Sequence, residues 1–111
     1  MNVNVKWDNV PNSRWAQGHI DAEASRLERH LPANAHLHLR VGQEGQQYRT
    51  KVHVHALGRD WVALGSGENM WAGISAAFDK ILRKLGEFKS SHKNRIHSNV
   101  RRFRDQTTLY L

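Results

Sequence analysis

Residues 36–64 read HLHLRVGQEGQQYRTKVHVHALGRDWVAL, and this stretch decides the fold. Leu37, Leu39 and Val41 alternate with polar side chains, which is the period of a strand with one apolar face. Residues 48–56 repeat the alternation, and residues 61–64 form a short apolar run. Turn residues separate the three runs, in the segments 42–46 and 58–60. The stretch therefore predicts three consecutive strands in an antiparallel meander.

The flanking segments predict one more strand and two helices. Residues 3–7 alternate as a short strand, and an apolar stripe at helical spacing predicts a helix over residues 13–31, ended by Pro32. The segment 65–67, Gly-Ser-Gly, reads as a turn that opens the second helix, with Ser66 as its N-cap. That helix carries Ile74, Phe78 and Ile81 on one face and should end near Lys93.

The element order β-α-β-β-β-α predicts an α+β domain of two layers. Each helix has one apolar stripe, so we expect a four-stranded sheet with both helices packed on one face. Residues 1–96 should form this domain. Residues 97–111 lack clear periodicity, so we expect a basic C-terminal tail.

The formal charge of +7 is concentrated at one end of the chain. Residues 1–79 hold eight Lys/Arg and eight Asp/Glu, so the whole excess falls in residues 80–111. Such segregation favours a polyanion-binding surface over a solvated face that only maintains solubility. The candidate RNA-binding residues in this segment are Lys80, Arg83, Lys84, Lys89, Lys93, Arg95, Arg101, Arg102 and Arg104.

Alternation also gathers polar side chains on the open face of the sheet. Arg40, Arg49 and Lys51 are further RNA-binding candidates there, and the same face carries four histidines, His36, His38, His53 and His55. These imidazoles have three open interpretations: plain surface, RNA contact, or a zinc or copper site. No carboxylate that would orient the rings is obvious in the sequence.

Other patterns give weaker signals. The Gly-Ser-Gly segment lacks the longer phosphate-loop motifs, so a turn is favoured over an anion site. Trp7, Trp61, Trp71, Phe78 and Phe88 resemble core or rim residues, whereas Trp15, Phe103 and Tyr110 are candidates for stacking on bases. No arrangement of nucleophile, base and acid emerges, so we expect no enzyme and no cofactor.

Composition excludes several classes of protein. The chain has no cysteine, so disulfides and thiolate metal sites are absent. It has neither a long apolar run nor a secretory signal, so we expect a cytoplasmic protein without membrane or small-molecule partners.

Three stretches resemble the ribosome hibernation promoting factor family, also called ribosome-associated inhibitors or sigma-54 modulation proteins. They are Val52 and Val54 followed by Gly58, the run GENMWAGI at residues 67–74, and FDKILRKL at residues 78–85. The similarity covers roughly residues 34–93, and the short form of the family is the one that fits. The chain departs from the family pattern at Asn69, Gly73, Ser75, Lys84, Gly86 and Glu87.

The resemblance implies binding to the small ribosomal subunit and its rRNA, which would block translation in resting cells as part of a stress response. It assigns rRNA contact to Lys80, Arg83, Lys89 and Lys93. Two alternatives stay open: a metal-binding or catalytic α+β protein that uses the histidine face, and a double-stranded-RNA-binding module.

Overall fold

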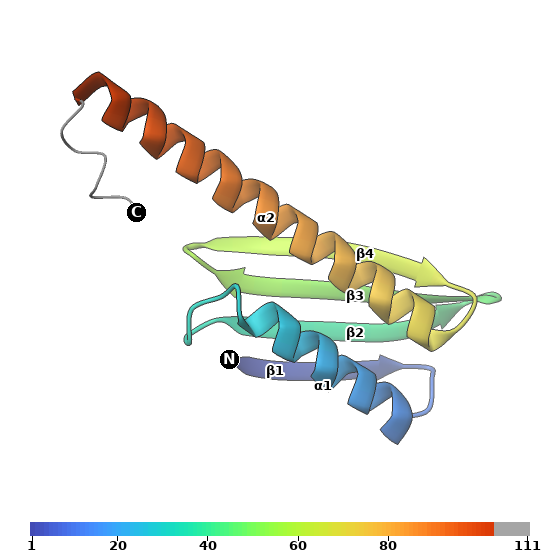
Figure 1. The fold of residues 1–111 in the computed structure, drawn as a ribbon. Coiled ribbons are helices and arrows are strands. Elements are labelled where there is room, and N and C mark those ends of the chain that lie inside the picture. Colours follow the sequence, from blue (N-terminus) through green and yellow to red (C-terminus); the bar gives the residue numbers. More distant parts are fainter. Residues whose placement is uncertain (104–111) are drawn as a thin grey trace.

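The computed structural model describes the backbone of residues 1–103 and the side chains of residues 1–90. Its elements, in chain order, are β1 (Asn2–Asp8), α1 (Arg14–Glu28), β2 (His36–Glu44), β3 (Gln47–Ala56), β4 (Arg59–Gly67) and α2 (Met70–Phe103). The strands form one sheet in the order β1-β2-β3-β4, and both helices lie on the same face of it (Figure 1). The predicted two-layer α+β architecture is confirmed.

The sheet is mixed. β2, β3 and β4 form the predicted antiparallel meander. β1 instead pairs parallel with β2, so that Asn2 lies opposite His36 and Asp8 opposite Gly42. Parallel neighbours need a crossover between them, and α1 provides it. β1 and β4 are therefore the two edge strands.

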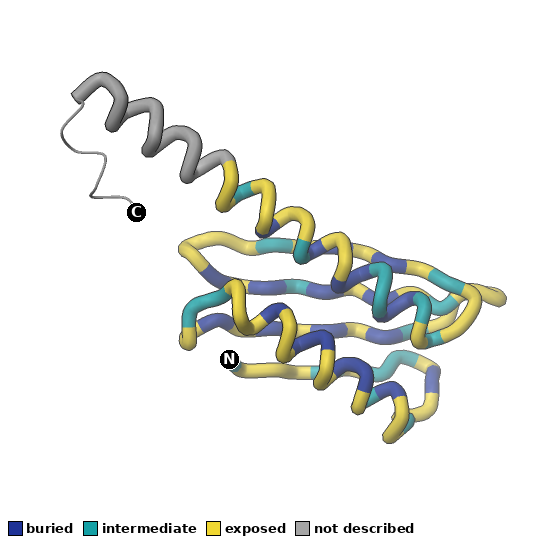
Figure 2. Tube along the Cα trace, in the orientation of Figure 1, coloured by how far each residue is buried: buried dark blue, intermediate teal, exposed yellow. Residues whose placement is uncertain are grey.

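One hydrophobic core lies between the sheet and the helices. β2 and β3 alternate buried with more exposed residues along most of their length, as the colours in Figure 2 show. Phe78 and Ile81 of α2 and Ile20 of α1 are fully buried against this face. The apolar stripes read from the sequence are thus the faces that pack on the sheet.

Two-residue turns set the register of both hairpins. Gly45 and Gln46 connect β2 to β3, and Leu57 and Gly58 connect β3 to β4. Leu57 and Gly58 have φ angles of 58° and 69°, the left-handed combination that a type I′ turn requires. The predicted turn at residues 58–60 is therefore misplaced, because residues 59 and 60 already belong to β4.

The predicted opening of the second helix is also wrong. Ser66 lies in β4, and the N-cap of α2 is Asn69, whose Oδ1 accepts a hydrogen bond from the Ala72 amide at 2.8 Å. The segment 65–67 is not a turn but the end of β4, a strand on which α2 packs closely. A Cβ atom at Gly65 would collide with the backbone of Ala77 and Gly73.

α2 extends to Phe103, past the expected end near Lys93. No glycine or proline follows Gly86, so nothing in this segment breaks the helix. Part of the segment expected as a tail is thus helical, and residues 104–111 lie outside the described part. The division at residue 96 stays a prediction. Within the described residues, no helix is long and apolar enough to cross a membrane.

Candidate nucleic-acid interface

The described cations of α2 are all exposed, but they are not equivalent. Lys80 Nζ donates a hydrogen bond to the Leu64 carbonyl oxygen at 2.7 Å, and Lys84 Nζ donates one to the Val62 carbonyl oxygen. These carbonyls belong to β4, so the two lysines cover an open edge of the sheet. Unpaired backbone groups at such an edge otherwise invite pairing with another chain.

Two other cations of α2 are uncommitted. Arg83 and Lys89 are exposed, and neither has a hydrogen bond or ion pair within the described residues. Their charges are therefore available to an external anion without breaking an internal contact. The remaining candidates on this segment have side chains outside the described residues; they are Lys93, Arg95, Arg101, Arg102 and Arg104.

The open face of the sheet gathers the polar residues as the alternation predicted. The register of β2 and β3 places His36 opposite His55, His38 opposite His53, and Arg40 opposite Lys51. Parallel β1 adds Asn4 beside His38 and Lys6 beside Arg40. A shallow groove of about 490 Å³ runs over this region, lined by Asn4, Val5, Lys6, His38, Leu39, Arg40, Lys51 and His53.

Two of the three predicted cations on this face have acidic partners. Arg40 Nε lies 2.8 Å from Asp8 Oδ2, and Arg49 lies 3.0 Å from a Glu44 carboxylate oxygen. All four side chains are solvent-accessible, and ion pairs of this kind contribute only about 0–1 kcal/mol, so an incoming phosphate can replace the carboxylate. Lys51 has no such partner among residues 1–90.

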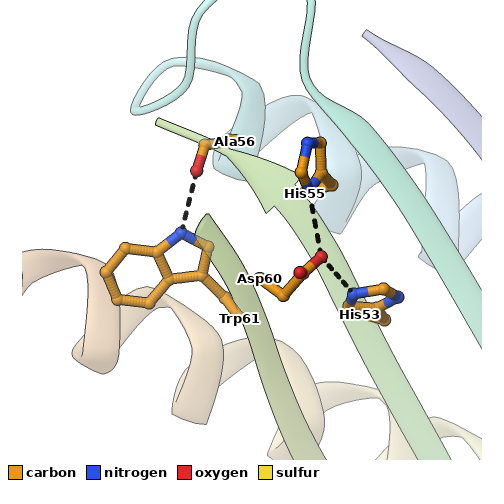
Figure 3. A network of polar contacts seen from close by, with 5 residues as sticks. All are labelled: His53, His55, Ala56, Asp60 and Trp61. Atoms are coloured by element: carbon orange, nitrogen blue, oxygen red, sulfur yellow. Dashed lines mark hydrogen bonds and ion pairs between the residues drawn. The ribbon is translucent and has the colours of Figure 1, made fainter. Parts of the chain in front are cut away.

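Asp60 is a functional candidate that the sequence analysis missed. Its Oδ1 lies 2.9 Å from His53 Nε2 and 3.0 Å from His55 Nδ1, so one carboxylate oxygen orients two imidazoles (Figure 3). The hydrogen bond with His55, followed by that with His53, holds the pKa of Asp60 below its ordinary value of 3.8. The tight turn at Leu57 is the signal that could have placed Asp60 opposite His55.

The metal interpretation gains no support from this geometry. Among the residues whose side chains are described, no group of three or more His, Cys, Asp or Glu could hold a metal ion. In the cluster of His53, His55 and Asp60, both rings are directed at the same oxygen of Asp60.

A cluster of aromatic rings lies where α1 meets α2. The ring of His19, which is 8% exposed, stacks on Trp71 at 3.6 Å and hydrogen-bonds through Nε2 with Ser75 Oγ at 2.8 Å. Trp15 lies against the same tryptophan, with ring centroids 4.8 Å apart. Trp15 is exposed as expected, but Trp71, assigned to the core or its rim, is 42% exposed.

The other predicted core aromatics lie on the helix side of the sheet. Trp61 Nε1 donates to the Ala56 carbonyl oxygen, as Figure 3 shows, and its ring meets Phe88 edge to face at 5.0 Å. Arg59 lies over Phe88, 4.5 Å from the ring centroid. Both rings therefore help to hold α2 on β4. The two remaining stacking candidates, at positions 103 and 110, have side chains outside the described residues.

Comparison with known proteins gives one family and a shared fold. Residues 3–93 match the family described as Sigma 54 modulation protein / S30EA ribosomal protein. No curated protein matches the chain. The Thermus thermophilus Protein Y N-terminal domain has a TM-score of 0.72 at 17% identity, covering 79% of this chain and 99% of that one. A ribosomal subunit interface protein from Coxiella burnetii has a TM-score of 0.72 at 13% identity, covering 81% and 99%. At these identities the two structures show the fold.

Proposed function

Because this chain belongs to the family of sigma 54 modulation proteins and S30EA ribosomal proteins, we propose that it binds the small ribosomal subunit through rRNA phosphates. Bound there, in the cytoplasm, it blocks translation in resting cells. The observation that carries the proposal is the charge distribution. The whole excess of +7 lies in residues 80–111, a segment that starts within α2 and whose first cation is exposed. A surface of this kind fits a phosphate backbone.

The contact residues are proposed from their environment. Arg83 and Lys89 are the strongest candidates, because within the described part of the chain neither has a hydrogen bond or an ion pair. Lys80 and Lys84 add positive potential while their ammonium groups hold the edge of β4. Further along the chain, the cations from Lys93 to Arg104 extend the same positive charge.

The open sheet face provides a second set of contacts, from Arg40, Arg49 and Lys51. These side chains are exposed and lie on the face opposite the helices, so the protein presents cations in two directions. A domain of this form suits a cleft lined by RNA on more than one side. The rRNA phosphates would then be met by α2 on one side and by the sheet on the other.

The test is co-sedimentation of the full-length protein with ribosomes and isolated subunits across a salt series. We expect the protein in the small-subunit fraction at low salt and its release as salt rises. If about five phosphates are neutralised, log K should fall with log salt with a slope of roughly −3.5 to −4.5. Absence from ribosomal fractions at low salt, or binding that ignores salt, contradicts the proposal.

A further inference from the structure

The open sheet face carries four histidines among nearly balanced fixed charges. The lysines and arginines of this face are Lys6, Arg40, Arg49 and Lys51, and its carboxylates are Asp8, Glu44 and Asp60. Four cations against three anions leave a net charge of only +1 while the imidazoles are neutral. If all four were protonated, the same face would carry +5. Free histidine changes its charge at a pH of about 6.5, close to that of the cell.

The groove concentrates this effect at one place. His38 and His53 line it, opposite each other on β2 and β3, with ring centroids 6.0 Å apart. Lys6, Arg40 and Lys51 line the same groove. Two imidazolium rings at this separation repel each other and the neighbouring cations. An anion in the groove removes this penalty, so protonation and anion binding favour each other.

Asp60 fixes where the proton goes on His53. An ionised carboxylate only accepts hydrogen bonds, so His53 Nε2 donates to it and Nδ1 is the nitrogen left to take up a proton. The lowered pKa of Asp60 keeps this carboxylate ionised throughout the range in which histidines titrate. The ring is therefore held in one orientation in both of its charge states.

We propose that this groove is a phosphate-binding site for RNA that takes up protons as it binds, so that RNA is held more tightly as pH falls. The inference rests on the proposed RNA binding and adds a regulator to it. A drop in intracellular pH would strengthen the hold on RNA without any conformational change.

Charged groups from all four strands share the open face with the two groove histidines. Lys6 and Asp8 face them from β1, His36 and Arg40 from β2, Lys51 and His55 from β3, and Asp60 from β4. The cations oppose protonation, and the carboxylates favour it. A bound phosphate adds negative charge at the groove itself, so the RNA complex binds more protons than the free protein does.

The experiment measures the affinity of the full-length protein for a short oligouridylate at pH 8 and pH 6, at one salt concentration. We expect wild-type affinity to rise roughly tenfold over this range, as for one linked proton. Calorimetry near pH 6.5, in two buffers of different ionisation enthalpy, should show the uptake of about one proton per RNA bound. The His38→Gln/His53→Gln variant should lose most of both effects.

Two matched variants separate the effect of proton uptake by the groove histidines from the effect of fixed positive charge on RNA binding. His30→Gln removes an exposed histidine outside the sheet and should keep the wild-type pH ratio. Lys51→Gln removes a fixed cation of the groove but no histidine, so it should weaken binding at both pH values. The proposal is overturned if the double Gln variant keeps the wild-type pH ratio, or if no proton is taken up.

Failure of the groove proposal can be distinguished from failure of the proposed ribosome binding. Ribosome co-sedimentation that is salt-sensitive but independent of pH would refute the proton-linked groove and leave ribosome binding in place. Proton-linked binding of the oligouridylate without any ribosome association would refute the proposed function and leave the groove as an RNA site. No binding of the oligouridylate at either pH overturns the groove proposal directly.

Discussion

Lys80 Nζ on α2 donates a hydrogen bond to the Leu64 carbonyl oxygen on β4, 2.7 Å away. One turn further along α2, Lys84 does the same for Val62. Two residues that sequence alone assigns to RNA contact thus also close an edge of the sheet. Substitutions of these lysines will therefore change both RNA binding and the sheet edge. Substitutions of Arg83 and Lys89 should change RNA binding alone.

Reversal of the two uncommitted charges should separate binding from folding. We expect Arg83→Glu/Lys89→Glu to weaken ribosome binding strongly while the Tm changes little, because both side chains are exposed and have no partner among the side chains of residues 1–90. Arg14→Glu/Arg29→Glu makes the same charge change at exposed sites around α1 and is the control. If both variants lose affinity equally, net charge rather than α2 governs binding.

Removal of the edge lysines should promote self-association. In Lys80→Ala/Lys84→Ala the carbonyl groups of β4 lose their donors, so the strand edge is open to pairing with another chain. We also expect a loss of about 1–2 kcal/mol in the free energy of unfolding, at about 0.5–1 kcal/mol per exposed hydrogen bond. Sedimentation velocity measures the association, and Arg83→Ala/Lys89→Ala matches the charge change without opening the edge.

Two glycine-to-alanine substitutions should change the free energy of unfolding in opposite directions. At Gly65 a methyl group would collide with the backbone of Ala77, so α2 must shift, and we expect destabilisation of several kcal/mol. At Gly86, an exposed helical site, no atom lies within 4 Å of the added Cβ, so alanine should stabilise by about 0.5–1 kcal/mol. Urea unfolding measures both. An unaffected Gly65→Ala protein would contradict the close helix–strand contact.

The left-handed residue Leu57 offers a stabilising substitution. Leucine at φ 58° costs roughly 1 kcal/mol relative to residues that favour this conformation, and Leu57 is 43% exposed. We therefore expect Leu57→Asn to raise the free energy of unfolding by about 0.5–1 kcal/mol. Thermal melts of the variant and the wild type measure this difference. Leu57→Val introduces a β-branched side chain, which tolerates this φ angle poorly, and should lower the free energy of unfolding.

The Asp60 carboxylate should give a pH-dependent difference in stability. Its pKa is lowered in the folded state by hydrogen bonds from His55 and His53, so the folded protein favours the ionised form. This contribution is present above the ordinary value of 3.8 and is lost as pH falls through the lower folded value. Wild type should therefore exceed Asp60→Asn in stability near pH 6, and the two curves should converge in strong acid.

The sequence by itself determined the element order, the faces of the strands and the packing stripes of the helices. These follow from local periodicity: Leu37 and Leu39 alternate with histidines, and Phe78 and Ile81 recur at helical spacing, whatever the rest of the chain does. The sharing of one face by the four histidines was predictable for the same reason. The positive charge of residues 80–111 needs no structure at all.

Only the tertiary structure decided which of these residues meet. The type I′ turn sets the register that brings Asp60 to two imidazoles, and a shift of one residue would have sent its side chain to the helix face. The parallel pairing of β1, the stack of His19 on Trp71 and the hydrogen bond from Lys80 to the Leu64 carbonyl join segments distant in sequence. Periodicity carries no information about such contacts, because they depend on how whole elements pack rather than on the residues within one of them.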